Sequence, residues 1–306
     1  MRKNKLSLRG VLVPKQSHKY KRLLGIASLS LAMTIVILFS LFLFRRNGDE
    51  VSAISIDKSD EMVEIPAGVF TMGSEDGEFD ERPLHEVELD DFSMDKYEVT
   101  YLQYQRFILA NPHWQKGNPK FDEADENYLR DWNSSEFPKG KENYPVAYVS
   151  WYAADAYAKW DQKSLPTERQ WEYAARGGYE GMQYVWGNNF ETHLSNWRGL
   201  PPHSPPYKGG DRGGVMPVGS YSINGFGIND MAGNVWEWTS DGYELYMDGN
   251  EKDPRPRLNN HLKVIRGGSW KSDKNSLRVS FRHTKKPNAC RIDIGFRCIK
   301  SVSVSD

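Results

Sequence analysis

The chain has very little cysteine. Only Cys290 and Cys298 occur among 306 residues, and its seven histidines are scattered. No cysteine or histidine pair has the spacing of a zinc or redox site. The two cysteines are eight residues apart, so a disulfide between them would close a small loop with little gain in stability. Two reduced, buried thiols are the other interpretation.

Acidic residues are absent from the first 46 positions, which contain ten Lys and Arg. This segment carries a charge of +10 and leaves −11 for the remainder, because the whole chain sums to −1. An acidic body would repel phosphates, which argues against nucleic acid as a partner. The same charge favours cation binding.

Charge of either sign is absent from residues 23–44, a run of 22 residues that begins at Leu23 and ends at Phe44. As a helix this run would be about 33 Å long, enough to cross a hydrocarbon core of about 30 Å. A cleavable signal peptide is the alternative, but its apolar region is typically about 7–15 residues and precedes small residues, whereas Arg45 and Arg46 follow here. We therefore predict a single-pass membrane protein anchored through Leu23–Phe44.

Eight Lys and Arg precede the apolar run and two follow it, which places the N-terminus in the cytoplasm. The predicted organisation is a basic cytoplasmic segment (1–22), a transmembrane helix (23–44), a linker (45–60), a soluble domain (61–300) and a tail (301–306). The domain is then periplasmic or otherwise extracytoplasmic.

The body shows short apolar alternations and long irregular stretches. Residues 62–74 predict a strand pair, and residues 85–100 predict a further strand region. Thr100, Ser150 and Thr167 have the character of helix N-caps, and Gly177 that of a helix end. Proline, glycine and charged residues make 110–143 and 184–220 irregular. We predict an α+β domain of about 240 residues.

The segment 225–241, GFGINDMAGNVWEWTSD, combines glycine turns with a tryptophan-bearing strand. Asp230 and Glu237 supply carboxylates, and the turn at Gly233–Val235 can supply backbone carbonyls. Hard cations such as calcium prefer this mixture of oxygens. The alternative is that the tryptophans are core residues and the acids are solvated turn residues.

Eight motifs in series resemble the formylglycine-generating enzyme, or sulfatase-modifying factor, family. They are IPAGVFTMG from Ile65, EVT from Glu98, PVAYVSW from Pro145, LPTERQWEYAARG from Leu165, WGN from Trp186, GNVWEW from Gly233, RGGSW from Arg266 and GFRC from Gly295. The resemblance covers residues 61–300. It implies the formylglycine-generating-enzyme fold, a variant of the C-type lectin fold with little regular structure.

The resemblance also implies structural calcium. One family site uses a side-chain oxygen, two backbone carbonyls and an acidic side chain around the GNVWEW motif. A second site uses an Asn and its neighbour, then an Asp and the residue two further on. The matching positions are Asp230, Gly233, Val235 and Glu237 for the first site, and Asn196, Trp197, Asp211 and Gly213 for the second.

The family's catalytic cysteines are missing. Active members carry two cysteines five residues apart that bind copper(I) and activate oxygen, and a soft redox metal needs such thiolates. The matching positions fall near Ser272 and Leu277, and residues 267–289 contain no cysteine. We therefore expect neither copper binding nor copper-dependent conversion of cysteine to formylglycine.

Two functions follow. The first is a non-catalytic binding or assembly module of an envelope complex, because relatives without the cysteine pair include components of bacterial surface machines. Its cleft would lie at Ser269, Trp270, Lys274, Arg278 and Arg282, near Lys271 and Arg291, and would attract acidic peptides, anionic glycans or a protein partner's carboxylates. Ordinary exposed cations are the alternative interpretation.

The second function is an enzyme with different chemistry, a formylglycine-generating oxidase or related oxidoreductase that does not depend on the cysteine pair. Relatives occur in iron-dependent sulfoxide synthesis and in siderophore maturation. His261 and His283 are the only histidines near the expected cleft, which is weak support for a metal.

Overall fold

The computed structural model describes residues 60–199, 214–247, 249, 251–252 and 261–301. The predicted cytoplasmic segment and membrane helix, nearly all of the linker, and Asp211 and Gly213 lie outside these residues. Within the described ranges, no helix has the length and apolar character needed to cross a bilayer.

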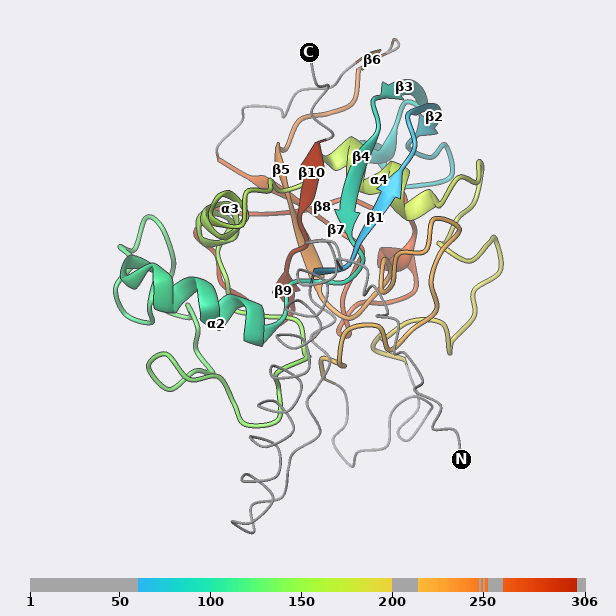
Figure 1. Ribbon diagram of the computed structural model, residues 1–306. Helices are drawn as coiled ribbons and strands as arrows, with labels where there is room; N and C mark the ends of the chain where they lie inside the picture. Colours follow the sequence, from blue (N-terminus) through green and yellow to red (C-terminus); the bar gives the residue numbers. More distant parts are fainter. Residues whose placement is uncertain (1–59, 200–213, 248, 250, 253–260, 302–306) are drawn as a thin grey trace, which may run out of the picture. The chain divides into compact units, whose positions relative to one another are not determined.

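The described strands form three small sheets with mixed strand directions (Figure 1). The first has the order β1 (Met62–Ile65), β4 (Phe92–Asp95), β10 (Ile299–Ser301), and the second β2 (Gly68–Met72), β3 (His85–Leu89), β6 (Glu251–Lys252). The third has the order β8 (His283–Lys285), β7 (Lys263–Arg266), β5 (Trp236–Gly242), β9 (Ile294–Gly295). β6 runs parallel to β3 and β9 parallel to β5, and the other pairs are antiparallel.

Residues 62–74 contain two strands, which belong to different sheets. β1 pairs with β4, and β2 pairs with β3. Only Pro66 and Ala67 connect β1 to β2. A two-residue hairpin turn needs positive φ, which the fixed ring of Pro66 does not allow, so the chain passes from one sheet to the next.

The helices begin where the sequence predicts. Helices α2 (Tyr101–Ala110), α3 (Trp151–Trp160) and α4 (Glu168–Arg176) follow Thr100, Ser150 and Thr167, whose hydroxyls accept hydrogen bonds from backbone N–H groups in the first turn. Gly177 ends α4 with a φ of 62°. Short 3₁₀ turns are η2 (Phe79–Glu81), η3 (Pro112–Trp114) and η4 (Asn275–Leu277).

Two apolar clusters form the core on either side of β5. One lies beneath α2 and α3, which occupy one flank of the domain in Figure 1, and includes Trp236 and Trp238. The other lies between β1–β4 and α4 and includes Trp171. Both tryptophans of the GNVWEW motif are buried, as their core interpretation predicts. β5 therefore lies between the two clusters and holds the GNVWEW motif in place.

Candidate functional site

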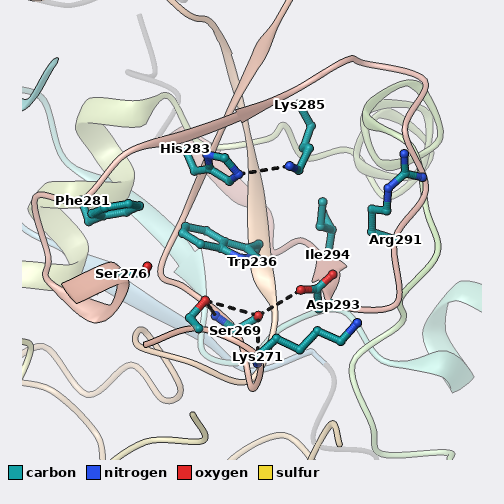
Figure 2. Close-up of a pocket in the computed structure, with 11 residues that line it drawn as sticks. Trp236, Ser269, Lys271, Ser276, Phe281, His283, Lys285, Arg291, Asp293 and Ile294 are labelled. Atoms are coloured by element: carbon teal, nitrogen blue, oxygen red, sulfur yellow. Dashed lines mark hydrogen bonds between the residues drawn. The ribbon is translucent and has the colours of Figure 1, made fainter. Parts of the chain in front are cut away.

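A pocket of about 360 Å³ lies against the β8–β7–β5–β9 sheet. Figure 2 shows Trp236 at its centre, His283 and Ser269 on opposite sides of the ring, and Lys285, Arg291 and the ammonium of Lys271 to one side. Its wall contains Trp236, Ser269, Lys271, Ser272, Ser276, Phe281, His283, Lys285, Arg291, Asp293 and Ile294. Strands β5, β8 and β9 and the loop after β7 build it.

Two glycines fold the loop after β7 back onto itself. Gly267 and Gly268 have φ values of 93° and 77°, which side-chain-bearing residues rarely adopt. A Cβ on Gly268 would lie 2.8 Å from the backbone oxygen of Ser276 and 2.7 Å from Leu277 Cδ2. Glycine at this position therefore lets residues 269–276 line one wall of the pocket.

Hydroxyl groups hold that wall in place. The Ser269 backbone N–H donates to Ser272 Oγ at 2.9 Å, and Ser269 Oγ accepts from the Lys271 backbone N–H at 3.2 Å. Ser269 Oγ donates to Asp293 Oδ2 at 3.1 Å. The Asp293 carboxylate is thus tied to the loop.

The pocket is cationic. Lys271, Lys285 and Arg291 oppose a single carboxylate, Asp293, and Arg291 also pairs with Asp125 at 2.6 Å. Lys285 Nζ lies 3.1 Å from His283 Nε2. An ammonium only donates, so the histidine must accept and be neutral in this arrangement. Burial, followed by the charge of Lys285, lowers the pKa of His283, in agreement with that geometry.

Some of the predicted cleft residues line the pocket and others do not. Ser269 lines the pocket, as does Ser272, the position matched to the first family cysteine. Trp270 and Lys274 are not among the lining residues. Leu277, matched to the second cysteine, is buried in the fold with 1% exposure. The pocket wall therefore contains serine hydroxyls and no thiol among the residues that the structure describes.

The placement of Arg278 and Arg282 in the cleft is wrong. Arg278 makes two hydrogen bonds of 2.7 Å to Glu81, and Arg282 makes two of 2.6 and 2.7 Å to Glu168. Both arginines are buried. Buried carboxylates attract the guanidinium groups inward because an unpaired buried charge is costly.

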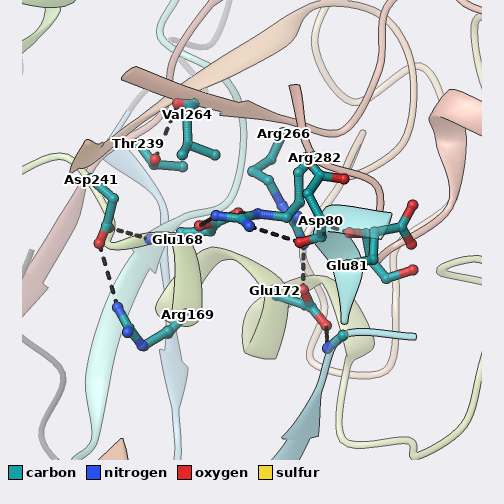
Figure 3. A network of polar contacts seen from close by, with 12 residues as sticks. Asp80, Glu81, Glu168, Arg169, Glu172, Thr239, Asp241, Val264, Arg266 and Arg282 are labelled. Carbon is teal, nitrogen blue, oxygen red and sulfur yellow. Dashed lines mark hydrogen bonds and ion pairs between the residues drawn. The ribbon is translucent and has the colours of Figure 1, made fainter. Parts of the chain in front are cut away.

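These pairs belong to a polar network that fixes α4 to the third sheet (Figure 3). Glu168 and Glu172 are four residues apart on α4 and therefore share a face. Arg266 of β7 bonds both of them, and Arg176 bonds Glu172 at 2.6 Å. Sequence reasoning missed this network, although the paired glutamates and the matching arginines were visible signals.

The two cysteines are free and buried, so the disulfide alternative is not realised in this structure. Neither lines the pocket. Burial raises the pKa of both the Cys290 and the Cys298 thiol, which disfavours the thiolate that metals and electrophiles require.

The first predicted calcium set lies at a buried group of acids. Asp230 Oδ2 and Oδ1 accept from the backbone N–H groups of Gly219 and Tyr221 at 2.5 and 3.2 Å. Glu237 accepts from Trp171 Nε1 and from two nitrogens of Arg297, each at 2.8 Å. The Glu237 carboxylate is therefore already well satisfied by protein donors.

Glu98, which sequence reasoning did not place at this site, is the least satisfied acid there. It is 1% exposed; its Oε1 accepts from Asn234 Nδ2 at 2.9 Å, and its buried Oε2 has no hydrogen-bond partner. Burial and then the charge of Asp230 raise its pKa well above the usual range, and burial raises the pKa of Asp230 to about 6. Its place in the EVT motif was the available signal.

Three buried carboxylates thus face one guanidinium, and one carboxylate oxygen is orphaned. A hard cation would relieve both conditions. Across the ranges that the structure describes, no three acidic, histidine or cysteine side chains converge on one point. A cation at this position would therefore have to take its remaining oxygens from backbone carbonyls or from solvent.

The second predicted set is only partly described. Asn196 Nδ2 donates to Gly214 O and to Asn234 Oδ1 at 2.8 and 3.2 Å, and Trp197 Nε1 donates to Thr192 O at 3.1 Å. Asp211 and Gly213 lie outside the described residues. Asn196 forms a bridge with Gly233, so the described half of this set adjoins the first.

Comparisons with known proteins agree with the fold and the motifs. The family profile described as "Sulfatase-modifying factor enzyme 1-like domain" matches residues 49–302. The serine/threonine-protein kinase pkn1 of Chlamydia caviae is 35% identical over 248 residues, which cover 79% of this chain and 38% of the kinase. The chain therefore spans well under half of that relative.

Two further relatives match over most of their own length. The formylglycine-generating enzyme of Streptomyces coelicolor is 33% identical over 283 residues, covering 79% of this chain and 90% of the enzyme. The solved structure of PvdO from Pseudomonas aeruginosa has a TM-score of 0.61 and 25% identity, covering 79% of this chain and 94% of PvdO. The chain belongs to the sulfatase-modifying factor family and has its formylglycine-generating-enzyme-like domain.

Proposed function

We propose that this protein is a non-catalytic member of its family, a pseudoenzyme that binds an anionic ligand as a component of an envelope complex. The ligand is an acidic peptide, an acidic glycan or a carboxylate-bearing protein surface. The observation that carries the proposal is the pocket wall, which combines the hydroxyls of Ser269, Ser272 and Ser276 with the ammonium groups of Lys271 and Lys285. Hydroxyls and ammonium groups bind anions well, but they do not hold copper(I).

The same proposal includes the membrane anchor. The uncharged run 23–44, with its excess of preceding Lys and Arg, supports a single-pass anchor with the domain outside the cytoplasm. A domain held at a membrane surface meets its ligand in a restricted volume. This raises the effective concentration of the ligand and favours assembly even when the intrinsic affinity is modest.

Calcium is proposed as a structural ion. Glu98 and Asp230 would provide carboxylate oxygens, and Gly233 and Val235 would provide backbone oxygens. The ion would supply positive charge to a region where Arg297 is the guanidinium that bonds Glu237. Glu237 would then contribute mainly through its ion pair with Arg297, which stabilises the segment that follows the Gly233–Val235 turn.

An enzymatic function is the second candidate, because the matched relatives include a formylglycine-generating enzyme. His283 lines the pocket and is neutral beside Lys285, so it could accept a proton. The pocket has no second histidine and no cysteine in its wall. Any such chemistry would need a mechanism unlike that of the cysteine pair.

Anion binding by the full-length chain tests the first proposal. Titration calorimetry at two salt concentrations would use an acidic peptide and an acidic glycan fragment as probes. We expect at least one probe to bind, with affinity that falls at higher salt and falls at least about tenfold when Lys271 and Lys285 are both replaced by alanine. Binding of neither probe, or binding unaffected by the double substitution, would refute the proposal.

A further inference from the structure

We propose that the pocket binds a carboxylated sugar, a pyranose that carries both a carboxylate and free hydroxyl groups, alone or as a unit of an acidic glycan. This inference rests on the anion-binding function proposed above and specifies its ligand. Three properties of the wall carry it: its cations, its one acceptor carboxylate and its apolar floor.

The cations require a negative group on the ligand. Lys271 and Lys285 come from different segments, the loop after β7 and strand β8, and both line the cavity. Lys285 donates a hydrogen bond to the neutral His283. Neither lysine is paired with a carboxylate among the ion pairs of the described residues, so a ligand carboxylate would be their first strong partner.

Asp293 requires hydrogen-bond donors on the same ligand. Ser269 Oγ donates to its Oδ2, and within the described ranges no other group is bonded to this carboxylate. A bare anion or an acidic side chain has no hydrogen to give to Asp293 and would be repelled by it. A sugar hydroxyl can donate to Asp293 while neighbouring hydroxyls accept from Ser272 and Ser276.

The floor and the volume suit one or two rings. Trp236, Phe281 and Ile294 supply the apolar part of the wall, and the rings of Trp236 and Phe281 have centroids 6.0 Å apart. The C–H face of a pyranose packs well on such a surface. A cavity of about 360 Å³ is near the lower end of small-molecule pockets, about 300–1,000 Å³, and is too small for a long peptide segment.

The test uses three matched probes with the full-length chain. Digalacturonate carries carboxylates and hydroxyls, galactobiose carries only hydroxyls, and a Glu-Glu dipeptide carries carboxylates, an ammonium and an amide N–H but no hydroxyl. We expect digalacturonate to bind at least about tenfold more tightly than either control, because only it combines carboxylates for the lysines with ring hydroxyls for Asp293, Ser272 and Ser276. Intrinsic tryptophan fluorescence, to which Trp236 of the pocket contributes, and titration calorimetry both report the binding.

The variant Asp293→Ala should change the affinities for digalacturonate and for sulfate in opposite directions. It should weaken digalacturonate about tenfold, because a charged acceptor is lost, but it should strengthen sulfate, because a repelling charge is removed. Asp293→Asn, which keeps the size of the side chain, should change both affinities in the same directions by a smaller factor. Lys285→Ala should weaken both anions, whereas Lys300→Ala, a loss of charge on β10 away from the pocket, should change neither.

Three outcomes would overturn the inference. Tighter binding of the dipeptide would leave an anion-binding module but assign it to acidic peptides. Equal binding of galactobiose would remove the role of the lysines. Binding of none of the three probes, with a native circular dichroism spectrum, would refute the sugar assignment. Formylglycine in a cysteine peptide would instead refute the proposed function.

Discussion

Replacing Glu98 by glutamine tests the proposed calcium site at its least satisfied atom. Glu98 is buried, and its Oε2 lacks a partner. The substitution keeps an oxygen that can accept from Asn234 but removes the negative charge that a cation needs. In the absence of calcium, burial and then the charge of Asp230 raise the pKa of Glu98, which makes its neutral form less costly than that of a solvated carboxyl. The substitution should then cost little stability.

Calcium should raise the Tm of the wild type more than that of Glu98→Gln. A ligand at one hundred times its Kd stabilises the folded state by about 2.7 kcal/mol, and a domain of this size gains about 2–4 °C in Tm for each kcal/mol. We therefore expect calcium to raise the Tm of the wild type by roughly 5–11 °C over the chelated protein. For Glu98→Gln the rise should be at most a few degrees.

The assay is thermal unfolding of both proteins in chelator and in a calcium series. Glu64→Gln is the matched control, because Glu64 is an exposed acid on β1 and its loss should leave the calcium response intact. A wild-type Tm that chelator leaves unchanged would refute calcium binding. A Glu98→Gln protein with the full response would place the ion elsewhere, for example at the second set near Asn196.

Three further predictions follow from the buried charges and thiols. Arg282→Met should lower the free energy of unfolding by about 3–5 kcal/mol because it leaves Glu168 buried without its bidentate partner; urea unfolding measures this, and a loss no larger than that of the exposed control Lys159→Ala would contradict it. Burial raises the pKa of Asp230 to about 6, so the folded state binds the Asp230 proton more tightly than the unfolded state does. The free energy of unfolding of the calcium-free protein should therefore fall as pH rises from about 4 to about 6. Asp230→Asn should flatten that slope in pH-dependent unfolding, and an unchanged slope would show that another group causes it. Both cysteines should resist alkylation in the native protein and react on denaturation, as followed by mass spectrometry; rapid modification of the folded chain would contradict their burial.

Glu237→Gln should behave differently from Glu98→Gln, although both positions belong to the same acidic group. Glu237 bonds Arg297 and Trp171. Its replacement should therefore destabilise the protein by several kcal/mol even in chelator. An effect that appears only in calcium would instead make Glu237 a direct ligand with no separate structural role.

Local signals in the sequence were sufficient to predict the helix ends. Thr100, Ser150 and Thr167 are N-caps because hydroxyl and backbone N–H are close in the chain, so no distant contact is needed to define them. The pairing of the strands could not be predicted from such local signals. β1 and β2 are adjacent in sequence but belong to different sheets, and the partner of each is selected by packing across the domain.

Part of the site was predictable because some of its residues are close together in the sequence. Ser269 belongs to the RGGSW motif and Ser272 follows that motif by two residues, and both lie in the pocket wall. Arg278 and Arg282 looked like cleft residues because they are cationic and near that motif. Their true partners, Glu81 and Glu168, are 197 and 114 residues away in the chain. The sequence shows the glutamates and the arginines, but no local pattern identifies which arginine bonds which glutamate.

We propose that the pocket binds an anion and performs no oxidation of cysteine. The most direct measurement is mass spectrometry of a sulfatase-type cysteine peptide after incubation with the full-length chain, copper(I), a reductant and oxygen. An active formylglycine-generating enzyme assayed in parallel would verify the conditions. We predict that this chain leaves the peptide cysteine unchanged; formylglycine formed in proportion to the amount of this protein would contradict the account.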